Sequence, residues 1–186
     1  MTNQLREHDD LRRTAAVAAD YTTLQGLINV TTGAGLVLWA LGWTTWVGPV
    51  IGFGAVAGSV YYRLRFGRAV RRGSAVATVA LVLAAFVVCM VGYVADGLLE
   101  GPVLVLPLLA ATCFAAAYRF GYRHVGVTRA HWAVAALLAV TAFASLVGLG
   151  ALEARTGVLT LGVAMAVVGL LDHVRLVRAM KPVPRD

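Results

Sequence analysis

The sequence predicts an all-α fold: a bundle of six transmembrane helices forming one polytopic membrane domain, with three helical hairpins as one possible arrangement. The first observation is composition. Of the 186 residues, 60% are hydrophobic and 13% are charged, whereas soluble domains are about 45–50% apolar and about 25% charged. The second observation is pattern, because 15 of the 16 basic residues gather at alternate gaps between six long apolar stretches. Lipid is therefore the expected solvent of this chain.

The six spans are expected to follow one another with short connections. They cover about residues 24–41, 47–62, 74–95, 102–118, 130–150 and 157–172. Several contain only about 16–18 apolar residues, which at about 1.5 Å per residue just reach across a hydrocarbon core of about 30 Å. The transmembrane domain is expected over residues 21–178, after a polar segment at 1–20 and before a tail at 179–186.

The ends of the spans carry turn and interface signals. Trp43 and Trp46 follow the first span, and tryptophan is enriched at membrane–water interfaces. Asp96 and Glu100 lie in the turn after the third span, where we expect both carboxylates to be solvated. Pro102 suits the first position of the fourth helix, because that position needs no backbone N–H.

Two pairs of glycines at i, i+4 spacing lie in the second span. Gly48 with Gly52, and Gly54 with Gly58, have the small-residue spacing that lets membrane helices approach closely. The two pairs fall on different faces of a helix. One pair is expected to pack inside the bundle, and the other leaves a homo-oligomer open as an alternative.

The basic clusters predict which side of the membrane each connection occupies. Three basic residues precede the first span, five follow the second, three follow the fourth and four lie in the tail, while Arg155 alone falls in the other set of turns. Short cytoplasmic loops are enriched in Lys and Arg, so both termini are expected in the cytoplasm. Abundant Arg, Ala, Val and Gly are typical of GC-rich bacterial genomes, which predicts a bacterial cytoplasmic (inner) membrane.

Polar residues near the cytoplasmic ends of the spans form the candidate ligand-binding site. It comprises Asp20, Gln25, Asn29, Tyr62, Asp172 and His173. A carboxylate beside a histidine can hold a metal or move a proton. Two acids and one histidine are too few ligands to assign a metal site, so we assign no metal, cofactor or catalytic residue. The alternative is that Asp172 pairs with Arg175 while His173 lies in the headgroup layer.

The first span is the most polar of the six. Gln25, Asn29 and Thr32 follow an i, i+4, i+7 course and therefore share one helix face. One hypothesis is a ligand-binding stripe in the cytoplasmic half of the bundle. The other is hydrogen bonding between helices that fixes their packing.

Five arginines follow the second span within ten residues. They are Arg63, Arg65, Arg68, Arg71 and Arg72. We expect them to contact anionic lipid headgroups or a protein partner. The formal charge of +7 does not indicate nucleic-acid binding, because the arginines lie at the ends of apolar segments instead of lining one face of a soluble domain.

Three short strings resemble uncharacterised six-span membrane proteins of actinobacteria. They are Asp20-Tyr-Thr-Thr-Leu-Gln-Gly26, Tyr61-Tyr-Arg-Leu-Arg-Phe-Gly67 and Gly169-Leu-Leu-Asp-His-Val-Arg175. Such proteins often look like companions of winged-helix regulators. The resemblance covers the whole layout, implies no reaction and assigns no functional residue.

These observations predict a non-catalytic membrane component, either a permease-like protein or a partner subunit with basic cytoplasmic loops. One alternative is a membrane-embedded enzyme acting on a lipid or isoprenoid, with Asp20, Asp172 and His173 at its cytoplasmic mouth. Another is a small-solute transporter with a cavity lined by Gln25 and Asn29. The central thirds of the six spans contain no charged residue, which weakens both alternatives, because such proteins usually place an ionisable group at depth.

Overall fold

The computed structural model describes residues 15–16, 21, 24–66, 75–99, 101–147 and 153–180. These residues contain no β-strand, so the all-α prediction is confirmed for them. Their helices are α2 (Gly26–Ala40), α3 (Thr44–Phe66), α4 (Ala75–Leu98), α5 (Val105–Gly121), α6 (Arg129–Ala142), the 3₁₀ helix η1 (Ala144–Val147) and α7 (Ala154–Ala179). Each α-helix coincides with one of the six predicted apolar stretches.

Three boundaries differ from prediction in ways that affect the site. α5 begins at Val105 and not at Pro102, because Leu104 is still extended and its N–H bonds to the carbonyl of Ala142 at 2.9 Å. The fifth stretch ends as an α-helix at Ala142. The last helix continues to Ala179, so Asp172 lies inside α7 instead of ending it.

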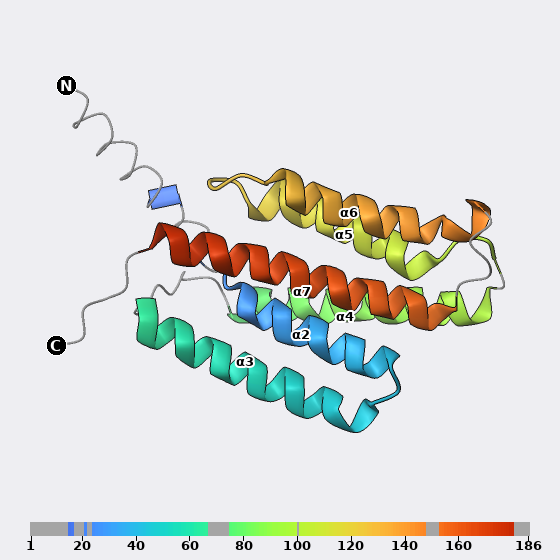
Figure 1. The fold of residues 1–186 in the computed structure, drawn as a ribbon, viewed down its shortest axis with the longest axis horizontal. Helices are drawn as coiled ribbons and strands as arrows, with labels where there is room; N and C mark the ends of the chain where they lie inside the picture. Colours follow the sequence, from blue (N-terminus) through green and yellow to red (C-terminus); the bar gives the residue numbers. More distant parts are fainter. Residues whose placement is uncertain are drawn as a thin grey trace.

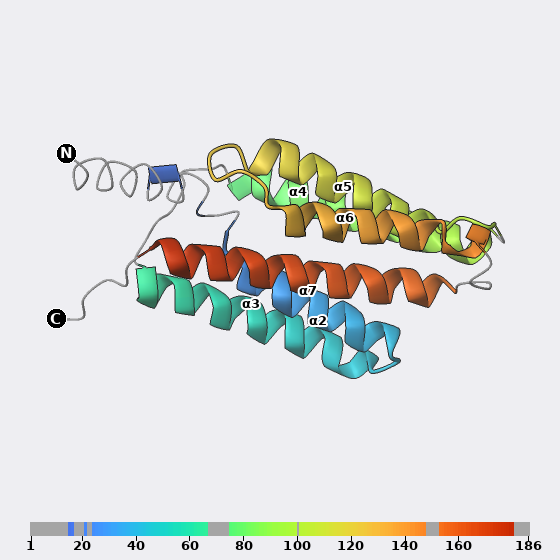
Figure 2. The same ribbon diagram turned by 45° about the horizontal axis from the view of Figure 1, so that its top comes forward.

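The helices run back and forth, with α7 at the centre of the bundle (Figures 1 and 2). α2 packs against α7 on one side and carries α3 on its other side, while α5 and α6 pack against α7 from the opposite direction and α4 lies against α5. The last turns of α3 and α7 and the α5–α6 loop lie at the same end of the bundle (Figure 1, left).

That end, called here the basic end, collects seven arginines of the described chain. They are Arg63, Arg65, Arg119, Arg123, Arg129, Arg175 and Arg178. Arg155 lies in the first turn of α7, at the opposite end. The sequence pattern that separates Arg155 from the other arginines therefore corresponds to a separation in space.

Glycines bring α2 and α7 into backbone contact. A Cβ atom added to Gly26 would lie 1.8 Å from the carbonyl oxygen of Gly169, and one added to Gly33 would lie 2.4 Å from that of Gly162. No side chain fits at such distances. Each helix places its two glycines seven residues apart, which is about two turns, so both contacts lie on one face and the helices run antiparallel.

Glycines also set the contact between α2 and α3. A Cβ atom on Gly54 would lie 2.2 Å from Thr31, and one on Gly58 would lie 3.4 Å from Leu27. Gly48 and Gly52 have no atom of another residue near the position of a Cβ. The prediction that the two glycine pairs point to different faces, with one pair inside the bundle, is confirmed.

The span lengths agree only in part with the sequence prediction. Among the described residues, α7 alone is both long enough and apolar enough to cross a membrane. α2, α5, α6 and the Val87–Leu98 part of α4 are apolar but shorter. The all-helical fold is thus established for these residues, while the crossing of a bilayer by all six helices stays a prediction.

We expect Gly169→Ala to lower the free energy of unfolding by about 1–3 kcal/mol, the usual penalty for overpacking, because the new methyl group meets the backbone of α2. Gly52→Ala is the matched control. It adds the same methyl group to open space, and replacing a helical glycine by alanine gains up to about 1 kcal/mol. Unfolding in mixed micelles with increasing dodecyl sulfate measures both. Equal stabilities of the two variants would contradict the close α2–α7 contact.

Candidate functional site

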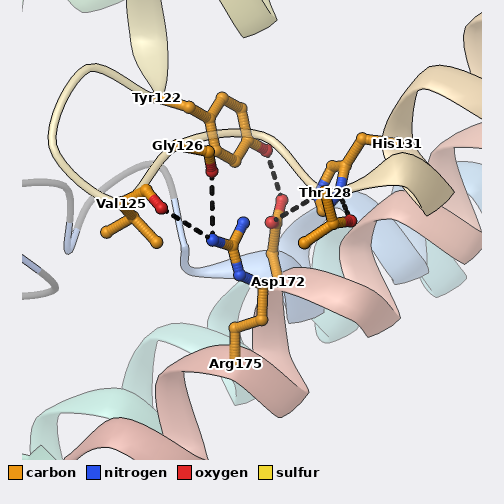
Figure 3. A network of polar contacts seen from close by, with 7 residues as sticks. All are labelled: Tyr122, Val125, Gly126, Thr128, His131, Asp172 and Arg175. Atoms are coloured by element: carbon orange, nitrogen blue, oxygen red, sulfur yellow. Dashed lines mark hydrogen bonds and ion pairs between the residues drawn. The ribbon is translucent and has the colours of Figure 1, made fainter. Parts of the chain in front are cut away.

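A completely buried carboxylate and imidazole meet between α7 and α6. Asp172 and His131 have no exposed surface, and His131 Nε2 lies 3.0 Å from Asp172 Oδ1 (Figure 3). The second carboxylate oxygen, Oδ2, accepts a hydrogen bond of 2.5 Å from the hydroxyl of Tyr122. Both oxygens of this buried acid are therefore engaged.

The start of α6 orients the imidazole. Thr128 occupies the N-cap, where a threonine hydroxyl commonly accepts a backbone N–H, but here the side chain forms no cap bond. Its hydroxyl instead lies 2.6 Å from His131 Nδ1. When that hydroxyl donates to Nδ1, the ring proton resides on Nε2 and points at Asp172.

Arg175, one turn beyond Asp172 on α7, fastens the α5–α6 loop. Its Nη2 donates to the carbonyls of Val125 at 3.1 Å and Gly126 at 3.0 Å (Figure 3). Gly126 has a φ of +72°, a conformation that glycine adopts without strain. The other terminal nitrogen of Arg175, Nη1, is buried without a hydrogen-bond partner, and so is the hydroxyl of Tyr118. We call Tyr122, Thr128, His131, Asp172 and Arg175 the Asp172 network.

Aromatic rings enclose this network. Tyr118 packs edge-on against Tyr122, His131 and Trp132, with ring centroids 5.4–5.6 Å apart. Burial first, and then the negative charge of Asp172, raise the pKa of Tyr122 above its ordinary value. The phenol therefore remains a hydrogen-bond donor to the carboxylate throughout the physiological pH range.

A second polar cluster lies on the α2–α3 side of α7. The hydroxyl of Tyr62 lies 3.0 Å from His173 Nδ1 and accepts the backbone N–H of Leu27 at 3.1 Å. Leu27 lies in the first turn of α2, where N–H groups lack partners within the helix, and Gln25 at the N-cap provides no side-chain bond. Tyr62 thus caps α2 from α3 and connects both helices to α7.

The structure brings together some of the predicted site residues and separates others. The side chains of Tyr62 and His173 are hydrogen-bonded to each other. Asp172 is adjacent to His173 in sequence, but successive helical residues point about 100° apart, so it belongs to the Asp172 network. Asp20 lies outside the described residues, and its place in a pocket stays a prediction.

The structure places the residues of the polar face of the first span in different surroundings. Thr32 donates its hydroxyl to the carbonyl of Ile28 within its own helix, at 2.9 Å. The Cβ of Asn29 faces Gly169 of α7, within 2.9 Å of the position of an added methyl group. Asn29 therefore lies at the tight α2–α7 contact. Gln25 precedes the first turn of α2 and is half-buried.

Two expectations about charged residues are wrong. Asp172 pairs with His131 and Tyr122 and not with Arg175, whose guanidinium turns to the loop carbonyls instead. Asp96 is not freely solvated, because its carboxylate accepts the backbone N–H of Leu106 at 3.0 Å and that of Val105. These N–H groups start α5 and have no partner within the helix.

Five arginines were predicted to contact lipid or a partner. Arg63 and Arg65 are exposed in the last turn of α3, at the basic end. Arg68, Arg71 and Arg72 lie outside the described residues.

Sequence reasoning missed Tyr122, Thr128 and His131. All three lie in or beside the basic stretch 119–129, which was interpreted only as a charged connection. The available signals were Thr128 and His131 at i, i+3 spacing at a helix start, and tyrosines four residues apart at the preceding helix end. Neither signal identifies Asp172 as the partner, because 41 residues separate His131 from it.

The described residues offer no metal site, since they contain no group of three or more His, Cys, Asp and Glu side chains arranged to hold an ion. The arrangement can hold and transfer a proton, because an acid, an imidazole and two hydroxyl groups form a continuous hydrogen-bonded chain. Comparison of the chain with protein families, with curated proteins and with solved structures finds no match. The function must therefore be argued from the geometry.

We expect Tyr62→Phe to lower the free energy of unfolding by about 1–3 kcal/mol. The change removes the acceptor of the partly buried Leu27 N–H and the partner of His173, and an unsatisfied polar group shielded from water carries a penalty of that order. Tyr61→Phe is the matched control at the neighbouring, exposed position, where a change within about 0.5 kcal/mol is expected. Chemical unfolding in micelles, monitored by circular dichroism, compares the two. An equal loss in both variants would contradict the capping role.

The raised pKa of Tyr122 predicts a loss of stability in alkali. The Tyr122 hydroxyl contributes fully to the free energy of unfolding below about pH 10, the pKa of tyrosine in the unfolded chain. As the pH rises further, this contribution is lost, because the unfolded chain releases the phenol proton at a lower pH than the folded chain does. The free energy of unfolding should therefore fall more steeply between pH 9 and 11 in the wild type than in Tyr122→Phe. If the free energies of unfolding of the wild type and of Tyr122→Phe fell in parallel with pH, the raised pKa of Tyr122 would be contradicted.

Proposed function

We propose that this protein is a multi-pass component of a bacterial cytoplasmic membrane, with six spanning helices and both termini in the cytoplasm. The supporting observation is that large apolar side chains cover much of the outer surface of the bundle, while two ionisable side chains are buried inside it. Large apolar residues point outward on α3, α4, α6 and α7, with Phe53 79% exposed and Leu98 77% exposed. Asp172 and His131 are completely buried.

Water would oppose this distribution. Exposed apolar surface is unfavourable by about 25 cal/mol per Å², and soluble monomers rarely expose continuous apolar patches above a few hundred Å². Hydrocarbon chains solvate the same surface without that penalty. An open apolar groove along α4, lined by Met90, Val91, Val94, Ala95, Leu98 and Leu99, fits an acyl chain in this arrangement.

The short helices impose a condition on the proposal. α2 has 15 residues and α6 has 14, or about 21–23 Å at 1.5 Å per residue, compared with a hydrocarbon core of about 30 Å. A bilayer thins locally around short spans at a modest free-energy cost per Å. Exposed Trp43 and Trp46, at 61% each, suit the interface at the end of the first hairpin.

The basic end supports a role in binding anionic lipid or a partner subunit without catalysis. Exposed Arg63 and Arg65 lie there with Phe120 and Trp132, which are also exposed. Each basic residue near an anionic leaflet contributes about 1 kcal/mol of attraction. The open face at Gly48 and Gly52 leaves room for a second copy.

The two alternatives have less support. A lipid-processing enzyme requires Asp172 and His173 at one cavity, and these residues instead bond to groups on different sides of α7. A solute transporter requires a cavity beside Asn29, whereas the backbones of α2 and α7 touch close to it.

Cysteine labelling in intact cells tests the proposed orientation. In a Cys89→Ser, Cys113→Ala background, Glu153→Cys should react with a membrane-impermeant maleimide, and Arg65→Cys should react only after permeabilisation. The two positions lie at opposite ends of the bundle, so each is the control for the other. Labelling of Arg65→Cys in intact cells, or release of the protein by alkaline carbonate, would contradict the proposal.

Lipid retention tests the role of the basic end. Substituting glutamine for Arg63, Arg65, Arg68, Arg71 and Arg72 together should reduce co-purified anionic phospholipid severalfold, because about 1 kcal/mol of attraction per arginine is removed. Arg155→Gln, at the other end, should retain the wild-type amount. Mass spectrometry of the purified protein measures lipid and any co-purified subunit. Unchanged lipid and no lost subunit would rule out this role for the cluster.

A further inference from the structure

The Asp172 network joins three parts of the chain that are distant in sequence. Asp172 and Arg175 belong to α7, His131 and Thr128 to the start of α6, and Tyr122 to the end of α5. We propose that the His131–Asp172 pair is a proton-binding site whose occupancy determines whether the α5–α6 loop stays fastened to α7. This inference goes beyond the proposed membrane role.

The geometry accommodates two protonation states of the imidazole. In the neutral state, Nε2–H donates to Asp172 and Nδ1 accepts from the Thr128 hydroxyl. A hydroxyl group can also accept. When a proton from water adds to Nδ1, an N–H bond forms, the hydroxyl rotates, and Nδ1–H donates to Thr128 Oγ1. No hydrogen bond is lost, no electron is transferred, and the pair gains one positive charge.

The groups around the pair determine whether the added positive charge is compensated. Among the described residues, the titratable or charged groups facing the pair are Tyr118 and Tyr122 of α5 and Arg175 of α7, with Tyr62 of α3 beyond. α2 contains no charged residue. With His131 neutral, the charges of Asp172 and Arg175 offset each other. A second proton on the His131 ring adds a positive charge that no further negative charge offsets. An uncompensated charge in a buried site is strongly unfavourable.

Arg175 is the group best placed to relieve this charge. It is only partly buried, whereas Asp172 and His131 are fully buried, and its Nη1 has no hydrogen-bond partner to lose. Movement of the guanidinium into solvent breaks its two bonds to Val125 and Gly126. Proton binding at the pair therefore releases the loop. The site lies at the basic end, so the proposed orientation makes the cytoplasm the source of the proton.

Two signals recorded on the purified full chain in lipid nanodiscs test the proposal. Carbon-13 NMR of labelled histidines follows the protonation of His131 between pH 8 and 5, with the signal assigned by loss in His131→Gln. A spin label on Arg123→Cys, in a background without Cys89 and Cys113, reports the mobility of the loop. We expect His131 to gain a proton and the label to become more mobile with the same midpoint.

Two variants separate this site from its surroundings. His173→Gln, one residue from Asp172 but in the other cluster, should leave the midpoint unchanged. Thr128→Val keeps the side-chain shape but removes the acceptor of Nδ1–H. Hydrogen bonds to charged groups are about twice as strong as neutral ones, so the midpoint should fall by about one pH unit, a tenfold weaker binding of the proton.

A single protonation state of His131 from pH 8 to 5 would overturn the proposal. So would a titration of His131 without a change in label mobility, because the pair would then not control the loop. If His131→Gln does not fold, assignment through loss of the His8, His124 and His173 signals in their own glutamine variants, together with Thr128→Val, still decides the question. Failure of the membrane orientation would leave these results unaffected.

Discussion

The backbone contact between α2 and α7 is the constraint on which the rest of the bundle depends. Gly26 and Gly33 meet Gly169 and Gly162 so closely that no side chain fits between the helices. In lipid, where water does not drive apolar helices together, such close approach supplies the van der Waals contact that holds them. It fixes the rotation of α7 about its axis, and thereby determines which way each residue of its half at the basic end points.

The fixed rotation of α7 gives two neighbouring residues separate roles. His173 reaches the hydroxyl of Tyr62, which in turn caps α2, so this residue consolidates the α2–α3 side. Asp172 reaches His131 and Tyr122 and connects the α5–α6 side. The two halves of the bundle are thus joined through consecutive positions of one helix, each by hydrogen bonds that are shielded from water.

The apolar side chains on the outside of the bundle and the polar groups inside it are both consistent with the proposed membrane environment. Outward-facing Phe, Leu and Val side chains need an apolar surrounding, while every carboxylate oxygen of the buried Asp172 has a partner. The polar network lies near the basic end, because Tyr122 follows the last residue of α5, Thr128 precedes α6 and Asp172 lies about two turns from the end of α7.

For the residues that the structure describes, sequence by itself determined the order and approximate extent of the six long helices, because apolar stretches and flanking arginines are local signals. It also predicted that Gly48 with Gly52 and Gly54 with Gly58 would lie on different faces, since helical periodicity follows from spacing alone. It also placed Tyr62 and His173 at the same level of the bundle, and their side chains are hydrogen-bonded in the structure. Only the tertiary structure paired Asp172 with His131 and turned Arg175 toward the loop. Those choices depend on the rotation of α7 about its axis, and that rotation is set by glycine contacts between residues that are more than 100 positions apart in the chain.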